Sequence, residues 1–154
     1  LDTGKMQTAG RLKIGYYDHK LFICLPSGRK LAYIEPEKRL NSFNRMELTY
    51  MGVGKTRKWE RIMTYGPKLV ENCIQAIARD ILAEAMLRVD ATGSHAVVNE
   101  YKAILFFFTQ AFFKRFEAVP VKELCDMMAE SPDWVDDKLP LRADGYECEW
   151  YRKD

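Results

Sequence analysis

YGPKLVENCIQAIARDILAEAMLRVDATG, residues 65–93, is the stretch that decides the fold. Counted at 100° per residue, its apolar residues gather on one side of a helix. Pro67 suits the first turn, where its missing N–H is no loss, and Gly93 suits the end. The pattern therefore predicts a long amphipathic helix with an apolar floor, formed by Val70, Cys73, Ile74, Ile77, Ile81 and Ala85.

A narrow polar stripe is expected on the opposite side of this helix, within an arc of roughly 60°. It consists of Lys68, Asn72, Gln75 and Arg79. Asn and Gln can donate to the base N3 and O2 acceptors of a minor groove, while Lys and Arg neutralise phosphate. On geometry alone, the favoured interpretation is an ordinary solvated surface with i, i+4 contacts.

The order of residues adds a resemblance. The segments 65–72, 75–80 and 82–88 resemble the palm helix of family A DNA polymerases, the DNA polymerase I type in its phage and prophage branch. The resemblance resumes further along the chain and also reaches back before the helix. These flanking blocks are 25–29, 57–61, 131–134, 139–147 and 151–154. The resemblance thus covers most of the chain.

The resemblance implies an α+β fold, an antiparallel sheet carrying one long amphipathic helix and a shorter C-terminal helix, as part of a polymerase palm. It implies template-directed nucleotidyl transfer in phage DNA replication, with deoxynucleoside triphosphates and Mg²⁺. The partners would be primer–template DNA and the missing N-terminal part of the polymerase. Gln75 would lie near the primer–template junction on the minor-groove side. The expected DNA-binding residues are Lys68, Asn72, Gln75 and Arg79, then Arg61 and Lys58.

Residues 94–119 depart from the family pattern. Family members form a β-hairpin there with the motif His-Asp-Glu, whose Asp helps to hold two Mg²⁺ ions. This chain has no such motif, and Glu100 is the only acidic residue near the expected place. We therefore expect no polymerisation and no firm Mg²⁺ binding by this chain alone. The alternatives are a non-enzymatic DNA-binding module or an inert prophage remnant. The gap itself could reflect a shifted reading frame, a replacement, divergence or a different local function.

Composition places bounds on these hypotheses. With 154 residues and 47% apolar content, the chain predicts a single domain, 1–154, with a modest core. A net charge of +2 is too small to argue for nucleic acid, so any DNA contact must come from local clusters. The four scattered cysteines predict free thiols in a cytoplasmic protein. The first residue, Leu1, indicates an excised or processed piece.

Along the chain, alternation and turn residues predict five strands. These are 11–17, 21–25, 30–34, 46–51 and 58–65. His19 is expected in a solvated turn and the polar segment 35–44 in a loop. A second helix with an apolar edge is expected from Val121, and a turn with a closing strand over 139–151.

The connection Gly52–Thr56 invites comparison with a phosphate-binding loop, but position 49 is Thr where that motif needs Gly. A hairpin is the favoured interpretation. Its cations Lys55, Arg57, Lys58 and Arg61 flank Trp59. Such a cluster suits a nucleic-acid backbone, or Trp59 packs on the core. The residues alone leave these two hypotheses about even.

Overall fold

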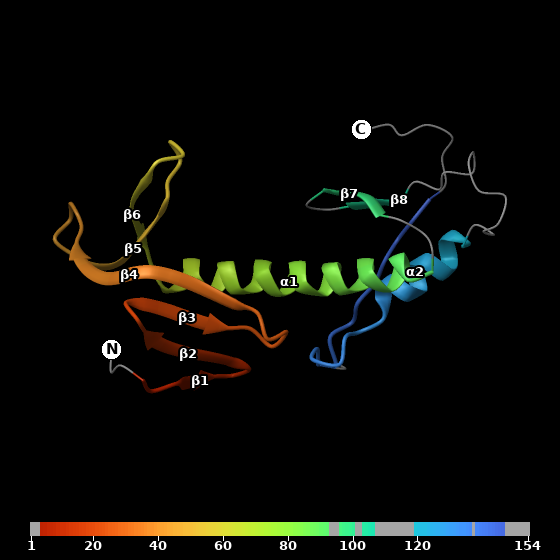
Figure 1. Ribbon diagram of the computed structural model, residues 1–154, viewed down its shortest axis with the longest axis horizontal. Helices are drawn as coiled ribbons and strands as arrows, with labels where there is room; N and C mark the ends of the chain where they lie inside the picture. The colour runs from red at the N-terminus through yellow and green to blue at the C-terminus, as the bar shows by residue number, and fades with distance from the viewer. Residues whose placement is uncertain (1–3, 93–95, 101–102, 107–118, 137, 147–154) are drawn as a thin grey trace. The chain divides into compact units, whose positions relative to one another are not determined.

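The computed structural model describes residues 4–92, 96–100, 103–106, 119–136 and 138–146. The fold is α+β, with a six-stranded antiparallel sheet, a separate strand pair and two helices in this part of the chain (Figure 1). The chain divides into two compact units, Leu1–Ala78 and Arg79–Asp154. The first helix begins in one unit and continues into the other. A single domain over 1–154 stays a prediction.

The six-stranded sheet of the first unit is a meander in which each strand pairs with the next. Its strands are β1 (Gln7–Ala9), β2 (Leu12–Tyr17), β3 (Lys20–Cys24), β4 (Lys30–Leu40), β5 (Met46–Val53) and β6 (Trp59–Thr64). The five strands expected from alternation are confirmed, and β1 is an addition. Asp18 and His19 form the turn between β2 and β3 with positive φ values of 49° and 54°. His19 is exposed there, as expected.

The core of the first unit lies between this sheet and α1 (Gly66–Asp90). Leu21 and Ile23 alternate along β3, so both point to the same side of the sheet, where Tyr33 of β4 joins them. The helix contributes Cys73 and Ala76 to the same buried cluster. The amphipathic helix is therefore confirmed, together with its start near Pro67.

The buried side of α1 in this unit differs from the predicted one. Leu69, Cys73 and Ala76 face the sheet, which rotates the buried side by roughly 100° relative to the predicted floor. Val70 and Ile74 are 56% and 62% exposed, so their predicted burial is wrong. Cys73 and Ala76 are small, so the helix can approach the sheet closely at these positions. The predicted floor consisted mainly of the larger β-branched residues.

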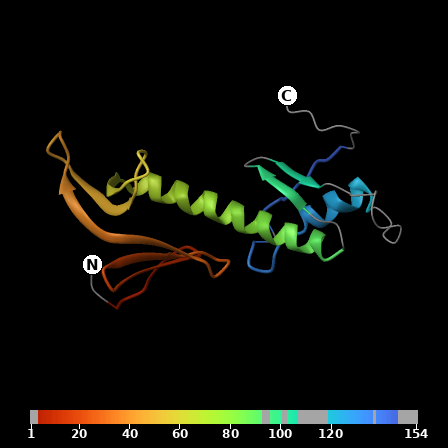
Figure 2. The same cartoon turned by 45° about the horizontal axis from the view of Figure 1, so that its top comes forward.

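The predicted loop over 35–44 is also wrong in its first half, because β4 continues to Leu40. The register shifts between Ile34 and Glu37, and Glu35 adopts a φ of +44°, which marks a β-bulge. The strand curves along its length in Figure 2. Residues Lys38–Leu40 are exposed, so they carry no alternating apolar pattern from which a strand could be predicted.

The second unit holds the end of α1, the strand pair β7 (Ala96–Glu100) and β8 (Ala103–Phe106), and α2 (Val121–Ala129). Among the residues of this unit that the structure describes, the buried apolar ones are Ala85, Val89, Leu124 and Val135. Side-chain contacts join α1 to Glu130 and Trp134, which follow α2. The indole Nε1 of Trp134 donates to Glu84 Oε2 at 2.7 Å, and Arg88 pairs with Glu130 at 3.1 Å.

The structure confirms the predicted second helix of this unit but not its closing strand. The helix from Val121 is confirmed, with Leu124 buried. The closing strand is not found over 139–146, because those residues form neither helix nor strand. The rest of that predicted strand and the helix stop at Gly93 lie outside the described residues.

Candidate nucleic-acid interface

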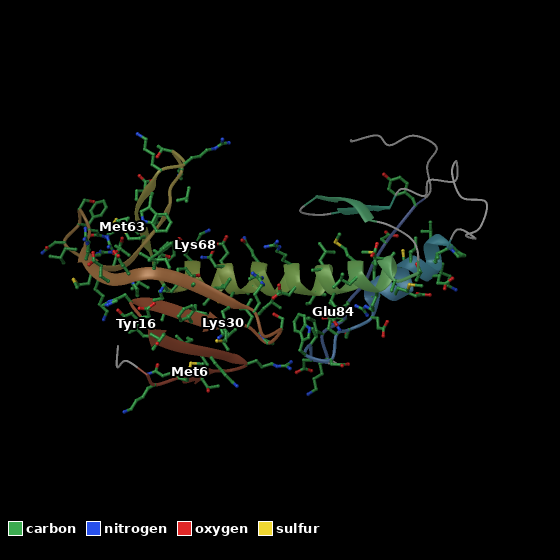
Figure 3. All side chains as sticks on the ribbon, in the orientation of Figure 1. Met6, Tyr16, Lys30, Met63, Lys68 and Glu84 are labelled. Carbon is green, nitrogen blue, oxygen red and sulfur yellow. The ribbon has the colours of Figure 1, made fainter. Side chains whose placement is uncertain are left out.

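Lys68 and Gln75 are exposed on α1, and Glu71 lies between them. The ammonium group of Lys68 pairs with Glu71 Oε2 at 2.9 Å. On the other side, the Gln75 amide Nε2 donates to Glu71 Oε1 at 3.1 Å. Figure 3 labels Lys68 near the start of the helix. One carboxylate thus holds the cation and the amide on neighbouring turns, with i, i+3 and i, i+4 spacing.

The hydrogen bond that Lys68 donates to Glu71, together with the negative charge of Glu71, raises the pKa of Lys68. Lys68 therefore stays a cation throughout the neutral range. Its side chain and that of Glu71 are 46% and 49% exposed, so water screens the pair and it adds little to stability. The pair can open without large cost when a phosphate competes for the ammonium group.

Asn72 is not exposed to solvent as Lys68 and Gln75 are. It is half-buried, and its amide Nδ2 donates to the hydroxyl of Tyr33 at 3.2 Å. Burial raises the pKa of Tyr33, whose ring also meets that of Tyr50 edge-on at 5.0 Å. Asn72 therefore joins the helix to the sheet, which is why the buried side of α1 extends toward the predicted polar stripe.

Arg79 is the first residue of the second unit. Its side chain is exposed and makes no hydrogen bond or ion pair within the part of the chain that the structure describes. It therefore keeps its full charge for a partner. Of the four residues of the predicted polar stripe, Lys68, Gln75 and Arg79 are exposed, and Asn72 is not.

Arg61 is engaged inside the sheet. Its side chain is only 19% exposed, and its guanidinium donates to the Glu35 carbonyl at 3.0 Å. It also reaches the carboxylates of Glu35 and Glu37 at 3.4 and 3.2 Å, and donates to Thr49 Oγ1 at 3.3 Å. These groups surround the β-bulge of β4, so Arg61 satisfies the backbone that the bulge leaves unpaired. Its guanidinium is committed to this structural role.

Lys58 lies at the hairpin between β5 and β6. The turn closes through hydrogen bonds from Gly54 N to Lys58 O at 2.9 Å and from Arg57 N to Gly54 O at 3.0 Å. The expected hairpin is confirmed, and no helix follows it as a phosphate-binding loop would need. Trp59 is 60% exposed, which excludes the hypothesis that it packs in the core. Lys55, Arg57 and Lys58 are all exposed around it.

Sequence reasoning missed Glu71 and Tyr33 as partners of the expected site residues. Glu71 could have been found, since a carboxylate three residues from Lys68 and four from Gln75 is a regular helical contact. Tyr33 and Asn72 are 39 residues apart, and only the packed structure brings them together.

The described residues contain neither a cluster of metal-ligating side chains nor a membrane-spanning helix. Nowhere in the described ranges do three or more His, Cys, Asp or Glu side chains gather so as to hold a metal ion. The two-metal centre that the resemblance implies depends on the segment 94–119, of which residues 94–95, 101–102 and 107–118 lie outside the described residues. No helix among the described residues is long and apolar enough to cross a membrane.

Comparison with known proteins gives one similarity. The chain is 39% identical, over 140 residues, to a protein named DNA polymerase from Bacillus phage SP02. The match covers 87% of this chain and 20% of that protein, so the chain spans about a fifth of its relative's length. No family model matches the chain. No solved structure matches it either.

Proposed function

We propose that the chain is the C-terminal palm portion of a family A DNA polymerase of the phage type, and that it contacts primer–template DNA. The observation that carries this proposal is the 39% identity to a phage DNA polymerase over 140 residues. The α+β architecture agrees with it. So does the antiparallel pair β7–β8, which follows α1 where the family resemblance implies a hairpin.

The exposed groups of α1 support a role in holding duplex DNA. Lys68 and Arg79 supply positive charge for phosphates, and Gln75 supplies an amide that can donate to a minor-groove acceptor. Lys58 adds a cation at the β5–β6 hairpin. The DNA-binding set that we propose is therefore Lys68, Gln75, Arg79 and Lys58, with Asn72 and Arg61 supporting the fold that presents them.

Glu71 gives this face a specific property. A carboxylate between Lys68 and Gln75 repels phosphate and also occupies both groups before DNA arrives. Binding then requires that Lys68 exchanges Glu71 for a phosphate and that Gln75 turns toward a base edge. We propose that Glu71 orders both side chains in the free protein and weakens non-specific binding.

Catalysis is the part of the polymerase function that we propose this chain lacks. Two-metal nucleotidyl transfer needs at least two placed carboxylates, and of the two in residues 94–119, Glu100 and Glu117, only Glu100 is near the expected place. Primer extension tests this with the purified chain, a primed template, deoxynucleoside triphosphates and Mg²⁺ or Mn²⁺. We expect no extension. Extension that is abolished by Glu100→Ala would overturn the proposal and make Glu100 a metal ligand.

The alternative is a non-enzymatic product, either a DNA-binding module or an inert prophage remnant. The absence of the family's His-Asp-Glu motif from the sequence supports this alternative. Binding to a primed duplex without extension fits a palm portion or a binding module. A chain that neither binds duplex DNA nor extends a primer is an inert remnant.

A further inference from the structure

The tip of the β5–β6 hairpin is an exposed element, and Lys58 is the one of its residues that the proposed duplex contact uses. Strand pairing continues to its last pair, Val53 opposite Trp59. The turn beyond this pair is closed by two backbone hydrogen bonds, and Arg57 adopts a φ of +60° within it. These hydrogen bonds close the tip into a defined turn.

Val53 and Trp59 form an exposed apolar pair on one face of this hairpin. Residues directly opposite in an antiparallel pair point to the same side of the sheet. Val53 is 63% exposed and Trp59 is 60% exposed. An indole held at this exposure on a fixed strand presents its ring to solvent, where another flat ring can stack on it.

The charged residues of the turn between Val53 and Trp59 are all cations. Lys55, Arg57 and Lys58 are exposed, and their side chains make no hydrogen bond or ion pair with any residue that the structure describes. Glu60 is the only carboxylate between residues 52 and 62. It follows Trp59 on the strand and so points to the opposite face, where it covers Gly54 so closely that a Cβ there would overlap its carboxylate.

We propose that this hairpin tip binds single-stranded nucleic acid, with the Trp59 indole stacked on an unpaired base and Lys55, Arg57 and Lys58 on the adjoining phosphates. An aromatic ring beside a cluster of cations is the combination that such strands require, and it tolerates any base because every base has a flat face. Paired bases in a duplex keep their faces covered by their neighbours. The inference shares with the proposed function the assignment to nucleic acid and the cation Lys58.

Fluorescence anisotropy with the full chain tests this, using a labelled 12-nucleotide oligo(dT) and a 12-base-pair duplex as probes. Trp59→Leu should weaken oligo(dT) binding by about 5- to 150-fold, the range found for loss of one base–aromatic stack. Trp59→Phe, which keeps a ring, should lose clearly less. Duplex affinity should change less than about twofold in both variants, since the ring does not reach a paired base.

Two controls separate this contact from general effects. Tyr17→Leu removes an aromatic ring that is 72% exposed on β2, and it should leave oligo(dT) affinity unchanged. Lys55→Ala, Arg57→Ala and Lys58→Ala should each lower the salt slope on oligo(dT) by about 0.7. Circular dichroism of every variant should match the parent, because the changed side chains are exposed.

Three results would overturn the inference. Oligo(dT) binding by Trp59→Leu equal to that of the parent would show that the indole makes no contact. Equal loss on oligo(dT) and duplex would place the contact on the backbone and not on a base. Absence of oligo(dT) binding in the parent would remove the site. Lys68→Ala and Gln75→Ala, measured on the duplex, test the proposed function separately, so either assignment can fail alone.

Discussion

The carboxylate of Glu71 accepts a hydrogen bond from the Gln75 amide at 3.1 Å while its other oxygen pairs with Lys68 at 2.9 Å. This arrangement places a negative charge in the middle of the face that we propose contacts DNA. It orders two side chains that would otherwise move freely. It also sets a local electrostatic barrier that a phosphate must overcome.

Replacement of Glu71 by Gln should strengthen duplex binding. Removal of the negative charge releases Lys68, so affinity should rise several-fold at low salt and the salt slope should steepen by about one unit. The matched control is Glu123→Gln on α2, which changes the net charge equally in the other unit. If both variants bind alike, the effect comes from net charge and Glu71 has no local role.

Loss of the Tyr33 hydroxyl should destabilise the first unit. In Tyr33→Phe the Asn72 amide loses its acceptor inside a half-buried contact, which should cost about 1 kcal/mol of unfolding free energy. Chemical denaturation of both proteins at neutral pH gives this difference. An unchanged free energy would mean that water replaces the hydroxyl without loss.

The same pair of proteins should differ in their response to alkaline pH. Burial raises the pKa of Tyr33 above its ordinary value of 10.0, so folding favours the neutral phenol. Its contribution is complete below about pH 10 and is lost as the pH rises through the folded-state pKa. The stability advantage of the parent over Tyr33→Phe should therefore shrink above pH 10. Cys73 acts in the same direction in both proteins, since burial raises its pKa above 9.0.

Two isoleucines one turn apart on α1 should respond differently to truncation. Ile77 packs against the core cluster, and Ile77→Ala should cost roughly 2 kcal/mol or more of unfolding free energy. Ile74 is 62% exposed, and Ile74→Ala should cost less than about 0.5 kcal/mol. Urea denaturation of both variants measures the contrast. Equal costs would show that α1 buries the face predicted from its pattern.

Arg61 should matter for stability and not for binding. Its guanidinium spans the bulge carbonyl of Glu35 and two carboxylates, so Arg61→Ala should destabilise by about 1.5–3 kcal/mol. The salt slope of DNA binding should stay unchanged at temperatures where the variant is folded. Lys58→Ala is the matched loss of one cation at an exposed position. A reduced salt slope in Arg61→Ala would restore Arg61 as a phosphate contact.

The sequence predicted most elements of the first unit because each strand combines alternation with clear turn residues. Asp18-His19 and Pro26–Arg29 bound β3, and Leu21 and Ile23 identify its buried side. The extension of β4 could not be predicted in this way. Lys38 and Arg39 are exposed on a strand that no apolar pattern marks.

The helix was predicted, and its buried side was predicted in part. Cys73 and Ala85 are buried as expected, whereas Val70 and Ile74 are exposed. The prediction assumed one continuous stripe of buried apolar residues along all 25 residues of α1. The buried pairs Cys73–Ala76 and Ala85–Val89 do not share one stripe at 100° per residue. Each half of the helix buries a different side within its own unit. One stripe fitted to the whole helix therefore included residues such as Ile74, which neither half buries.

The candidate site was predicted in part. Lys68, Gln75 and Arg79 are exposed as expected, because cations and amides at this spacing avoid the core. The roles of Asn72 and Arg61 depend on Tyr33 and on the bulge at Glu35, two contacts across distant parts of the chain. Such contacts leave no local pattern in a sequence.

The central claim is that the exposed face of α1 contacts duplex DNA, and a salt titration of duplex binding tests it most directly. Lys68→Ala and Arg79→Ala should each weaken binding on any sequence and flatten the salt slope by about one unit. Gln75→Ala should leave the slope unchanged and cost about 1 kcal/mol, the value of one hydrogen bond. Binding by all three variants equal to that of the parent would contradict the claim and leave this face of α1 as a solvated surface.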